Sequence, residues 1–293
     1  MSFWDILSLL AGLSFFLFGM STMSNGLEKA AGSKLEVILK KMTSNLLVSI
    51  FVGATITAVI QSSSATTVML VGLVNSGLMN FANTIGVIFG ANIGTTITAW
   101  LLSLSGLESD SFIIQLVKPQ NFTPILAIIG IAFTMMSKSE KKKTLGTIFV
   151  GFTVLIYGMD IMSDAVGGLA DSPTFTNLLT NFNNPFVGIL IGAIVTAVIQ
   201  SSSASVGILQ ALCATGAVTY GTALPIIMGQ NIGTCVTAVL SSIGVSRNAK
   251  KVAVVHLSFN IIGTTICLIP FCIATYFMDL PLLRASINPL MIA

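Results

Sequence analysis

Two long stretches of the chain contain no Asp, Glu, Lys or Arg, and they restrict the available folds more than any other feature. They run from Met42 to Leu107 and from Ser172 to Ser246, and they are 66 and 75 residues long. Because about 20 apolar residues span a bilayer once, each stretch can enter the membrane more than once. Only 8% of the 293 residues are charged, against about 25% in soluble domains. We therefore expect an integral membrane protein, and we exclude nucleic-acid binding because no basic face is present.

One segment of the chain occurs twice at an offset of 139 residues. Gly53 to Ala65 reads GATITAVIQSSSA and Gly192 to Ala204 reads GAIVTAVIQSSSA, with identity at 11 of 13 positions. The same offset aligns GANIGT, starting at Gly90, with GQNIGT, starting at Gly229. We therefore predict a unit that is present in two copies. The expected organisation is a single membrane transport domain, 1–293, with repeats over about 11–104 and 150–243 and a final helix over about 250–277.

The apolar runs within a repeat are too short for ordinary spanning helices. Leu46 to Ile60 and Ala65 to Val74 are separated by the polar tetrad QSSS, which favours a re-entrant hairpin. The alternative is one long tilted helix from Leu46 to Val74, with the serines bonded to their own helix. The hairpin agrees with the positive-inside rule, because it puts eleven basic residues inside and two outside. The inside set is Lys29, Lys34, Lys40, Lys41, Lys138, Lys141, Lys142, Lys143, Arg247, Lys250 and Lys251, and the outside set is Lys118 and Arg284.

This topology gives the two repeats opposite orientations. We expect an all-α integral membrane protein with two inverted-topology repeats, each with spanning helices, a re-entrant helical hairpin and a broken helix. The break is expected at the glycines of GANIGT and GQNIGT, although the same glycines could instead permit close helix packing. Inverted repeats with broken elements are typical of secondary transporters. The predicted location is the inner (plasma) membrane, multi-pass, with a retained first helix and the N-terminus outside.

The polar tetrads are the candidate binding site. An irregular turn in hydrocarbon must be buried in protein or line a water-filled cavity, and the helix that follows each turn directs its free N–H groups into that cavity. The serine hydroxyls of Ser62, Ser63, Ser64, Ser201, Ser202 and Ser203 suit a tetrahedral oxyanion, with carboxylates left open. Neutral oxygens of Gln61, Gln200, Thr57, Thr66, Thr196 and Ser205 could hold a monovalent cation.

Other polar residues contribute little to a catalytic hypothesis. The chain has one histidine, His256, and few acids within spans, so an enzyme is not expected. His256 is interpreted as a satisfied structural group. Asp160 is a functional candidate because it lies within a span, with solvation at the membrane interface as the alternative.

With these motifs, the chain resembles the type II sodium-phosphate cotransporter family (bacterial sodium/phosphate symporters), whose members carry the QSSS tetrad twice, each followed by a GxNIGT segment. The resemblance implies inorganic phosphate as substrate and sodium as coupling ion, with no other cofactor. It adds Asn92, Thr95, Asn231 and Thr234 to the site. The expected phosphate residues are then Ser62, Ser63, Ser64, Asn92, Ser201, Ser202, Ser203 and Asn231. The expected sodium residues are Gln61, Thr57, Thr66, Thr95, Gln200, Thr196, Ser205 and Thr234.

Two features of the chain limit what the family resemblance implies. Cys235 replaces the Thr96 of the first repeat, so we do not expect two equivalent sodium sites. The chain stops at Ala293, where many bacterial relatives add a soluble helical domain, so we expect no control of that kind. A phosphate exporter, a carrier of another oxyanion and a non-transporting membrane subunit stay open. The expected partners are phosphate, sodium and the lipid bilayer, with a homodimer as a further expectation.

Overall fold

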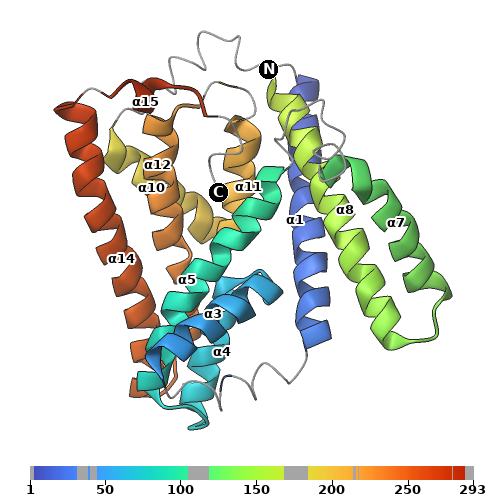
Figure 1. Cartoon of the computed structure of the whole chain (residues 1–293), viewed down its shortest axis with the longest axis horizontal. Helices are drawn as coiled ribbons and strands as arrows, with labels where there is room; N and C mark the ends of the chain where they lie inside the picture. Colours follow the sequence, from blue (N-terminus) through green and yellow to red (C-terminus); the bar gives the residue numbers. More distant parts are fainter. Residues whose placement is uncertain are drawn as a thin grey trace.

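The computed structural model describes residues 3–31, 39, 45–104, 119–167, 184–213, 216, 218–278 and 280–287, and within these ranges the regular structure is helical (Figure 1). This confirms the predicted all-α class. The first half contains α1 (Phe3–Ala31), α3 (Leu46–Ile60), α4 (Ser63–Asn75), α5 (Phe81–Ser103) and α7 (Pro119–Met136). The second half contains α8 (Glu140–Gly167), α10 (Pro185–Ile199), α11 (Ser202–Cys213), α12 (Tyr220–Gly233), α13 (Cys235–Ser241), α14 (Arg247–Tyr276) and α15 (Pro281–Arg284).

Six helical segments of the described chain are long and apolar enough to cross a membrane. They are α1, α5, α7, α8, the α12–α13 segment and α14. The shorter apolar helices α3, α4, α10 and α11 have 12 to 15 residues each. A multi-pass membrane protein is therefore confirmed, while the inverted orientation of the repeats stays a prediction.

Helices α1 and α8 pack against each other through glycines that are related by the repeat offset. A methyl group at Gly12 would collide with the backbone at Gly158, and one at Gly19 with the backbone at Gly151. The offset of 139 maps Gly12 onto Gly151 and Gly19 onto Gly158, so each contact is the counterpart of the other. Small residues permit such close backbone approach in membranes. Helix α7 packs along the outer side of α8, away from the remaining helices (Figure 1).

Each repeat then forms two short helices joined by a turn and packed against a longer helix. In the first repeat α3 ends at Ile60 and α4 begins at Ser63, so the alternative of one tilted helix over Leu46 to Val74 is wrong. In the second repeat α10 ends at Ile199 and α11 begins at Ser202. Helix α3 packs along α5, and α10 packs along α12.

Glycines again allow the close contact between these helices. A methyl group at Gly90 would meet the carbonyl oxygen of Ile50, and one at Gly229 would meet that of Ile189, which are equivalent contacts in the two repeats. The packing alternative therefore describes these glycines better than the unwinding hypothesis. Helix α5 runs without interruption from Phe81 to Ser103, so the broken helix predicted for the first repeat is wrong. In the second repeat α12 and α13 meet at a minor interruption at one residue, Thr234, whose backbone stays in the helical region and whose N–H donates to the carbonyl of Gln230.

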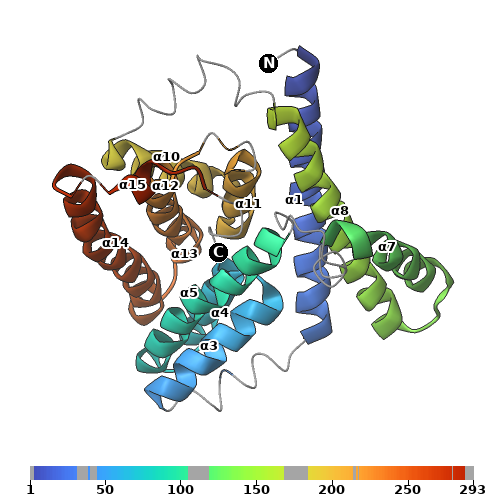
Figure 2. The ribbon, with the colours of Figure 1, turned by 45° about the horizontal axis from the view of Figure 1, so that its top comes forward.

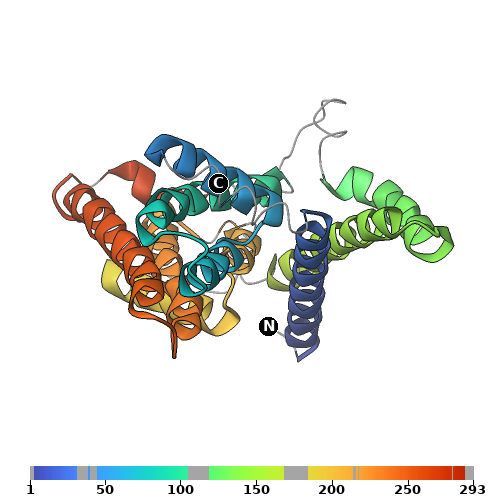
Figure 3. The same cartoon turned by 90° about the horizontal axis from the view of Figure 1, so that it is seen from below.

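The two repeats also contact each other across the centre of the molecule (Figures 2 and 3). Helix α4 of the first hairpin packs against α13, and α11 of the second hairpin packs against α5. Helix α14 adds a wall that contacts α4, α5, α12 and α13, with the rings of Phe89 and Phe259 stacked at 4.5 Å between centroids. The second arm of each hairpin is thus supported by the long helix of the other repeat.

Candidate functional site

The two hairpin turns are built around glutamines with an unusual backbone conformation. Gln61 has φ 59° and Gln200 has φ 58°, and they are the non-glycine residues with positive φ in the described chain. Each backbone N–H donates to a threonine carbonyl in the preceding helix, Gln61 to Thr57 at 2.6 Å and Gln200 to Thr196 at 2.7 Å. A left-handed conformation at a residue other than glycine costs about 1–3 kcal/mol and is concentrated at functional sites. Its recurrence at the same position of both tetrads points to the turns as functional.

The first serine of each tetrad caps the second arm of its hairpin. Ser62 Oγ accepts a hydrogen bond from the N–H of Ala65 at 3.1 Å, and Ser201 Oγ accepts one from the N–H of Ala204 at 3.2 Å. N-cap hydroxyls satisfy one of the free donors at a helix start. The oxygens of these two serines therefore hold the turns together, and their predicted role in binding a ligand stays a prediction.

The remaining serines of the tetrads lie in the first turns of α4 and α11. Helix geometry leaves the N–H groups of Ser63, Ser64, Ser202 and Ser203 without an intrahelical acceptor. The four side chains are buried, at 5 to 9% exposed. Each hairpin therefore concentrates backbone donors, hydroxyls and the positive end of a helix dipole at one buried place. This combination is what an anion needs.

The candidate sodium residues differ between the hairpins. Thr57 and Thr66 lie together, with their hydroxyl oxygens 3.0 Å apart across the two arms of the first hairpin. In the second hairpin Ser205 donates to the carbonyl of Ser201 at 3.1 Å. The hydroxyl of Thr196 is buried and has no hydrogen-bond partner among the described residues. The Thr196 hydroxyl of the second hairpin can therefore bind a ligand, whereas its counterpart Thr57 is already bonded to Thr66.

The residues added by the GxNIGT segments lie on the helices that pack along the hairpins, and three of their side chains bond to their own helices. Asn92 donates to the carbonyl of Ile88 at 2.9 Å, and Thr95 donates to that of Ala91 at 3.0 Å. Thr234 donates to the carbonyl of Gln230 at 2.9 Å, and Asn231 is exposed. The roles of these four residues stay predictions.

Two buried glutamines near the hairpins were not among the candidates. Gln210 on α11 donates from Nε2 to the carbonyl of Ala99 on α5 at 3.1 Å, which joins the repeats. Its Oε1, like that of Gln230 on α12, has no hydrogen-bond partner in the described part of the chain. The first repeat has Val71 and Ala91 at these positions. An amide replacing an apolar side chain in one repeat was the signal that could have identified them.

Cys235 joins the helix interruption to α14. Its Sγ accepts from Asn260 Nδ2 at 3.3 Å and contacts the carbonyl oxygen of His256 at 3.7 Å. Both ring nitrogens of His256 are buried without a hydrogen-bond partner in the described ranges, so the interpretation of its side chain as satisfied was wrong. Thr96, the counterpart of Cys235, is exposed and bonds to the carbonyl of Ile93 in its own helix.

Asp160 has a structural partner rather than an open environment. Its Oδ1 accepts a hydrogen bond from Gln120 Nε2 at 2.9 Å, between α8 and α7. This contact helps to fix α7 on α8, at a distance along the chain from both tetrads. The structure therefore gives Asp160 a bond between helices, and it stays outside the candidate site.

Comparison with known proteins identifies related chains. The sequence model of a family described as Na+/Pi-cotransporter matches this chain twice, over residues 15–164 and 154–283. The two matches agree with the internal repeat found in the sequence. No solved structure is matched with significance.

Three relatives illustrate the range of the similarity. "Uncharacterized protein YqeW" of Bacillus subtilis is 31% identical over 94% of this chain and 85% of its own length. "Putative inorganic phosphate export protein YjbB" of Escherichia coli K12 is 25% identical over 91% of this chain, but only 47% of its own length is covered. Human "Sodium-dependent phosphate transport protein 2B" is 34% identical over 45% of this chain and 20% of its own length.

Proposed function

Since the chain belongs to the Na+/Pi-cotransporter family, we propose that it carries inorganic phosphate across a membrane, coupled to sodium ions. The paired hairpin turns are the observation that carries this proposal. Each puts buried serines, unpaired N–H groups and a helix N-terminus together, and phosphate offers several acceptor oxygens to such donors. The second arms of both hairpins pack on the long helix of the other repeat, which supports one shared site.

The assignment of ligands follows from the chemistry of the donors. Ser63, Ser64, Ser202 and Ser203 donate to phosphate, together with the N–H groups of the same turns. The hydroxyl of Thr196 has no hydrogen-bond partner among the described residues. Together with the amide oxygens of Gln61 and Gln200 it provides neutral oxygens of the kind that suits a hard cation. Because Thr57 and Thr66 already bond each other, the stronger cation site is expected in the second hairpin.

The membrane orientation follows from the basic residues. With the N-terminus outside the plasma membrane, eleven basic residues lie inside and two outside, as the positive-inside rule requires. Lys34, Lys40, Lys41 and Lys118 of that count lie outside the described residues. A homodimer stays an expectation.

The test is phosphate transport by the purified protein in liposomes. We expect uptake of labelled phosphate that rises with an inward sodium gradient and falls when potassium replaces sodium. A second candidate, export, is favoured by the name of the Escherichia coli relative. Liposomes loaded with labelled phosphate, with the sodium gradient reversed, distinguish net export from uptake. The absence of phosphate flux in both directions, with folded protein, would favour a non-transporting subunit.

A further inference from the structure

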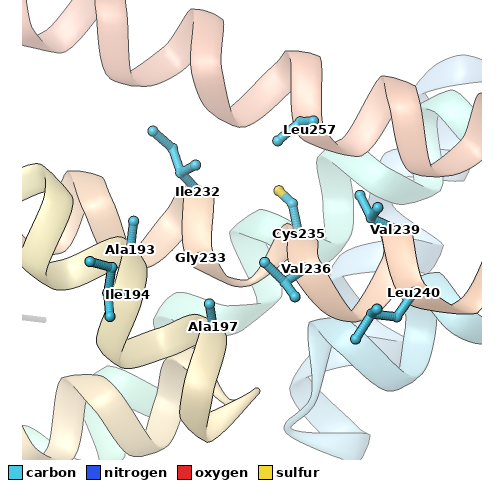
Figure 4. A pocket seen from close by; sticks show the side chains of 10 residues that line it. All are labelled: Ala193, Ile194, Ala197, Ile232, Gly233, Cys235, Val236, Val239, Leu240 and Leu257. Atoms are coloured by element: carbon cyan, nitrogen blue, oxygen red, sulfur yellow. The ribbon is translucent and has the colours of Figure 1, made fainter.

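A groove with apolar walls lies beside the helix interruption of the second repeat (Figure 4). It has a volume of about 340 Å³ and is open on one side. Its walls include Ala193 and Ala197 of α10, Val236, Val239 and Leu240 of α13, and Leu257 of α14. Figure 4 shows Val236 and Leu240 facing the space below α14, with Ala193 and Ala197 on the opposite wall. The volume falls in the range of ordinary ligand sites, about 300–1,000 Å³.

The groove opens onto a surface that faces lipid. The side chains of Val239 and Leu240 at its edge are 41% and 49% exposed, and the walls belong to α10 and to two segments long enough to span a membrane. This surface is therefore in contact with the hydrocarbon chains of the bilayer. An apolar groove there is filled by something with the shape of an acyl chain, since water has no polar partner in it.

A basic end lies in line with the groove. Arg247, Lys250, Val254 and Leu257 follow one another at spacings of 3, 4 and 3 on α14, so they share one face of the helix. Val254 on this face is 59% exposed, and Arg247 and Lys250 are exposed at the start of the helix. A face that is apolar along the span and cationic at its end matches an anionic lipid, with its chain along the helix and its phosphate at the end.

We propose that this groove binds one anionic phospholipid, whose acyl chain lies between α10, α13 and α14 and whose headgroup contacts Arg247 and Lys250. The proposal does not depend on the transported substrate. The bound chain packs against Gly233 and Cys235, on both sides of the interruption at Thr234. Ala197 in the opposite wall lies three residues before Gln200. The lipid therefore supports the second hairpin from the membrane side.

The corresponding place in the first repeat provides a matched control. The offset of 139 makes Ile97 of α5 the counterpart of Val236, and Trp100 the counterpart of Val239. The side chains of Ile97 and Trp100 are 38% and 56% exposed, and neither lines the groove. Ile97 is therefore a position that the repeat relates to Val236 but that lies outside the proposed site.

Native mass spectrometry of the purified full chain, titrated with POPG or POPC, measures this binding directly. We expect one POPG to be retained more strongly than POPC. Each of Arg247→Gln and Lys250→Gln should weaken POPG retention by roughly fivefold and leave POPC unchanged. The control Lys141→Gln with Lys142→Gln, in the exposed basic turn of α8, should have no such effect.

Filling the groove tests the position of the acyl chain. Val236→Trp should reduce POPG retention, while Ile97→Trp should not, and Ala197→Leu provides a smaller filling substitution should the tryptophan disturb folding. Equal retention of POPG and POPC overturns the proposal, as does normal POPG retention in both Ala197→Leu and Arg247→Gln. A shift of the oligomeric state in Val236→Trp, without loss of lipid, would identify the groove as an interface between copies and also overturn it. Because the readout is lipid mass, failure here is distinct from failure of phosphate transport.

Discussion

Gln61 and Gln200 combine two properties that substitution can separate. Their backbones hold the hairpin turns at positive φ, and their side chains place a neutral amide at the turn. Glycine adopts positive φ without the steric cost of a Cβ atom. A glutamine at this position is therefore retained for its side chain, at a cost in backbone strain.

Replacement of Gln61 or Gln200 by glycine should keep the turn and remove the amide oxygen. We expect thermal stability within about 1 kcal/mol of the parent, because relief of strain offsets the extra freedom of glycine in the unfolded chain. The sodium concentration for half-maximal phosphate uptake should rise, since a cation ligand is lost. Gln61→Ala should show the same sodium effect, and its thermal stability should be lower than that of Gln61→Gly. Unchanged sodium activation in both glycine variants would move the cation site elsewhere.

The serines inside the first turns of α4 and α11 should respond differently from the capping serines. Alanine at Ser63 or Ser202 removes a hydrogen bond to a charged ligand, worth about 1.5–3 kcal/mol, so phosphate affinity should fall roughly 10- to 100-fold. At Ser62 alanine also removes the N-cap, which costs about 1 kcal/mol of stability.

Binding of phosphate and thermal unfolding, measured on the same preparations, separate these two effects. The controls are Ser103→Ala and Ser241→Ala, because each hydroxyl donates to a carbonyl of its own helix. They should leave phosphate affinity unchanged. Normal affinity in alanine variants of all six tetrad serines would show that the site is not at the turns.

Among the helical elements, the contact of α3 with α5 and of α10 with α12 depends on glycines at equivalent positions. Gly53 and Gly192 approach the carbonyl oxygens of Val87 and Ile226, the mirror of the approach made by Gly90 and Gly229. A carbonyl of a neighbouring helix cannot move aside as a flexible side chain can. These contacts set the distance between each hairpin and its long helix.

Gly90→Ala and Gly229→Ala should each lower thermal stability by about 1–3 kcal/mol, because the added methyl group overpacks a helix contact. Gly72 and Gly263 provide controls, since an added Cβ there has nothing within 4 Å. Alanine at either control should be neutral or stabilise by up to about 1 kcal/mol through helix propensity. Thermal unfolding in detergent measures both. A Gly90→Ala variant as stable as Gly72→Ala would refute the packing role.

At the scale of the whole molecule, we predict that the two repeats have opposite orientations in the membrane. The helical pairs and their glycine contacts recur at one offset, and α1 packs on α8 through contacts that are counterparts of each other. The distribution of basic residues predicts that the connection between α7 and α8 lies in the cytoplasm.

Cysteine labelling tests this orientation in a background with the four native cysteines replaced. A cysteine at Ser139, which is exposed between α7 and α8, should react with a membrane-impermeant reagent only from the cytoplasm. A cysteine at Ser172, which lies outside the described residues, should react only from the outside. Both positions reacting from the same side would contradict the inverted topology.

Much of the architecture could be predicted from the sequence because it depends on local patterns. The polar tetrad interrupts an apolar run, and α3 ends at Ile60, where that run ends. The low content of charged residues predicted an integral membrane protein, and the tetrads predicted where donors gather. Each of these inferences uses residues that are neighbours along the chain.

The tertiary structure decided what depends on partners that are distant in the sequence. Only the packing of α3 on α5 shows that Gly90 serves close contact rather than unwinding, and only the position of α14 explains why Cys235 is buried while Thr96 bonds to its own helix. The different states of Thr57 and Thr196 likewise arise from contacts across a hairpin. A sequence repeat predicts equivalent elements, but their neighbours differ, because α14 packs against α12 and α13 as well as α4 and α5, whereas α7 packs on α8.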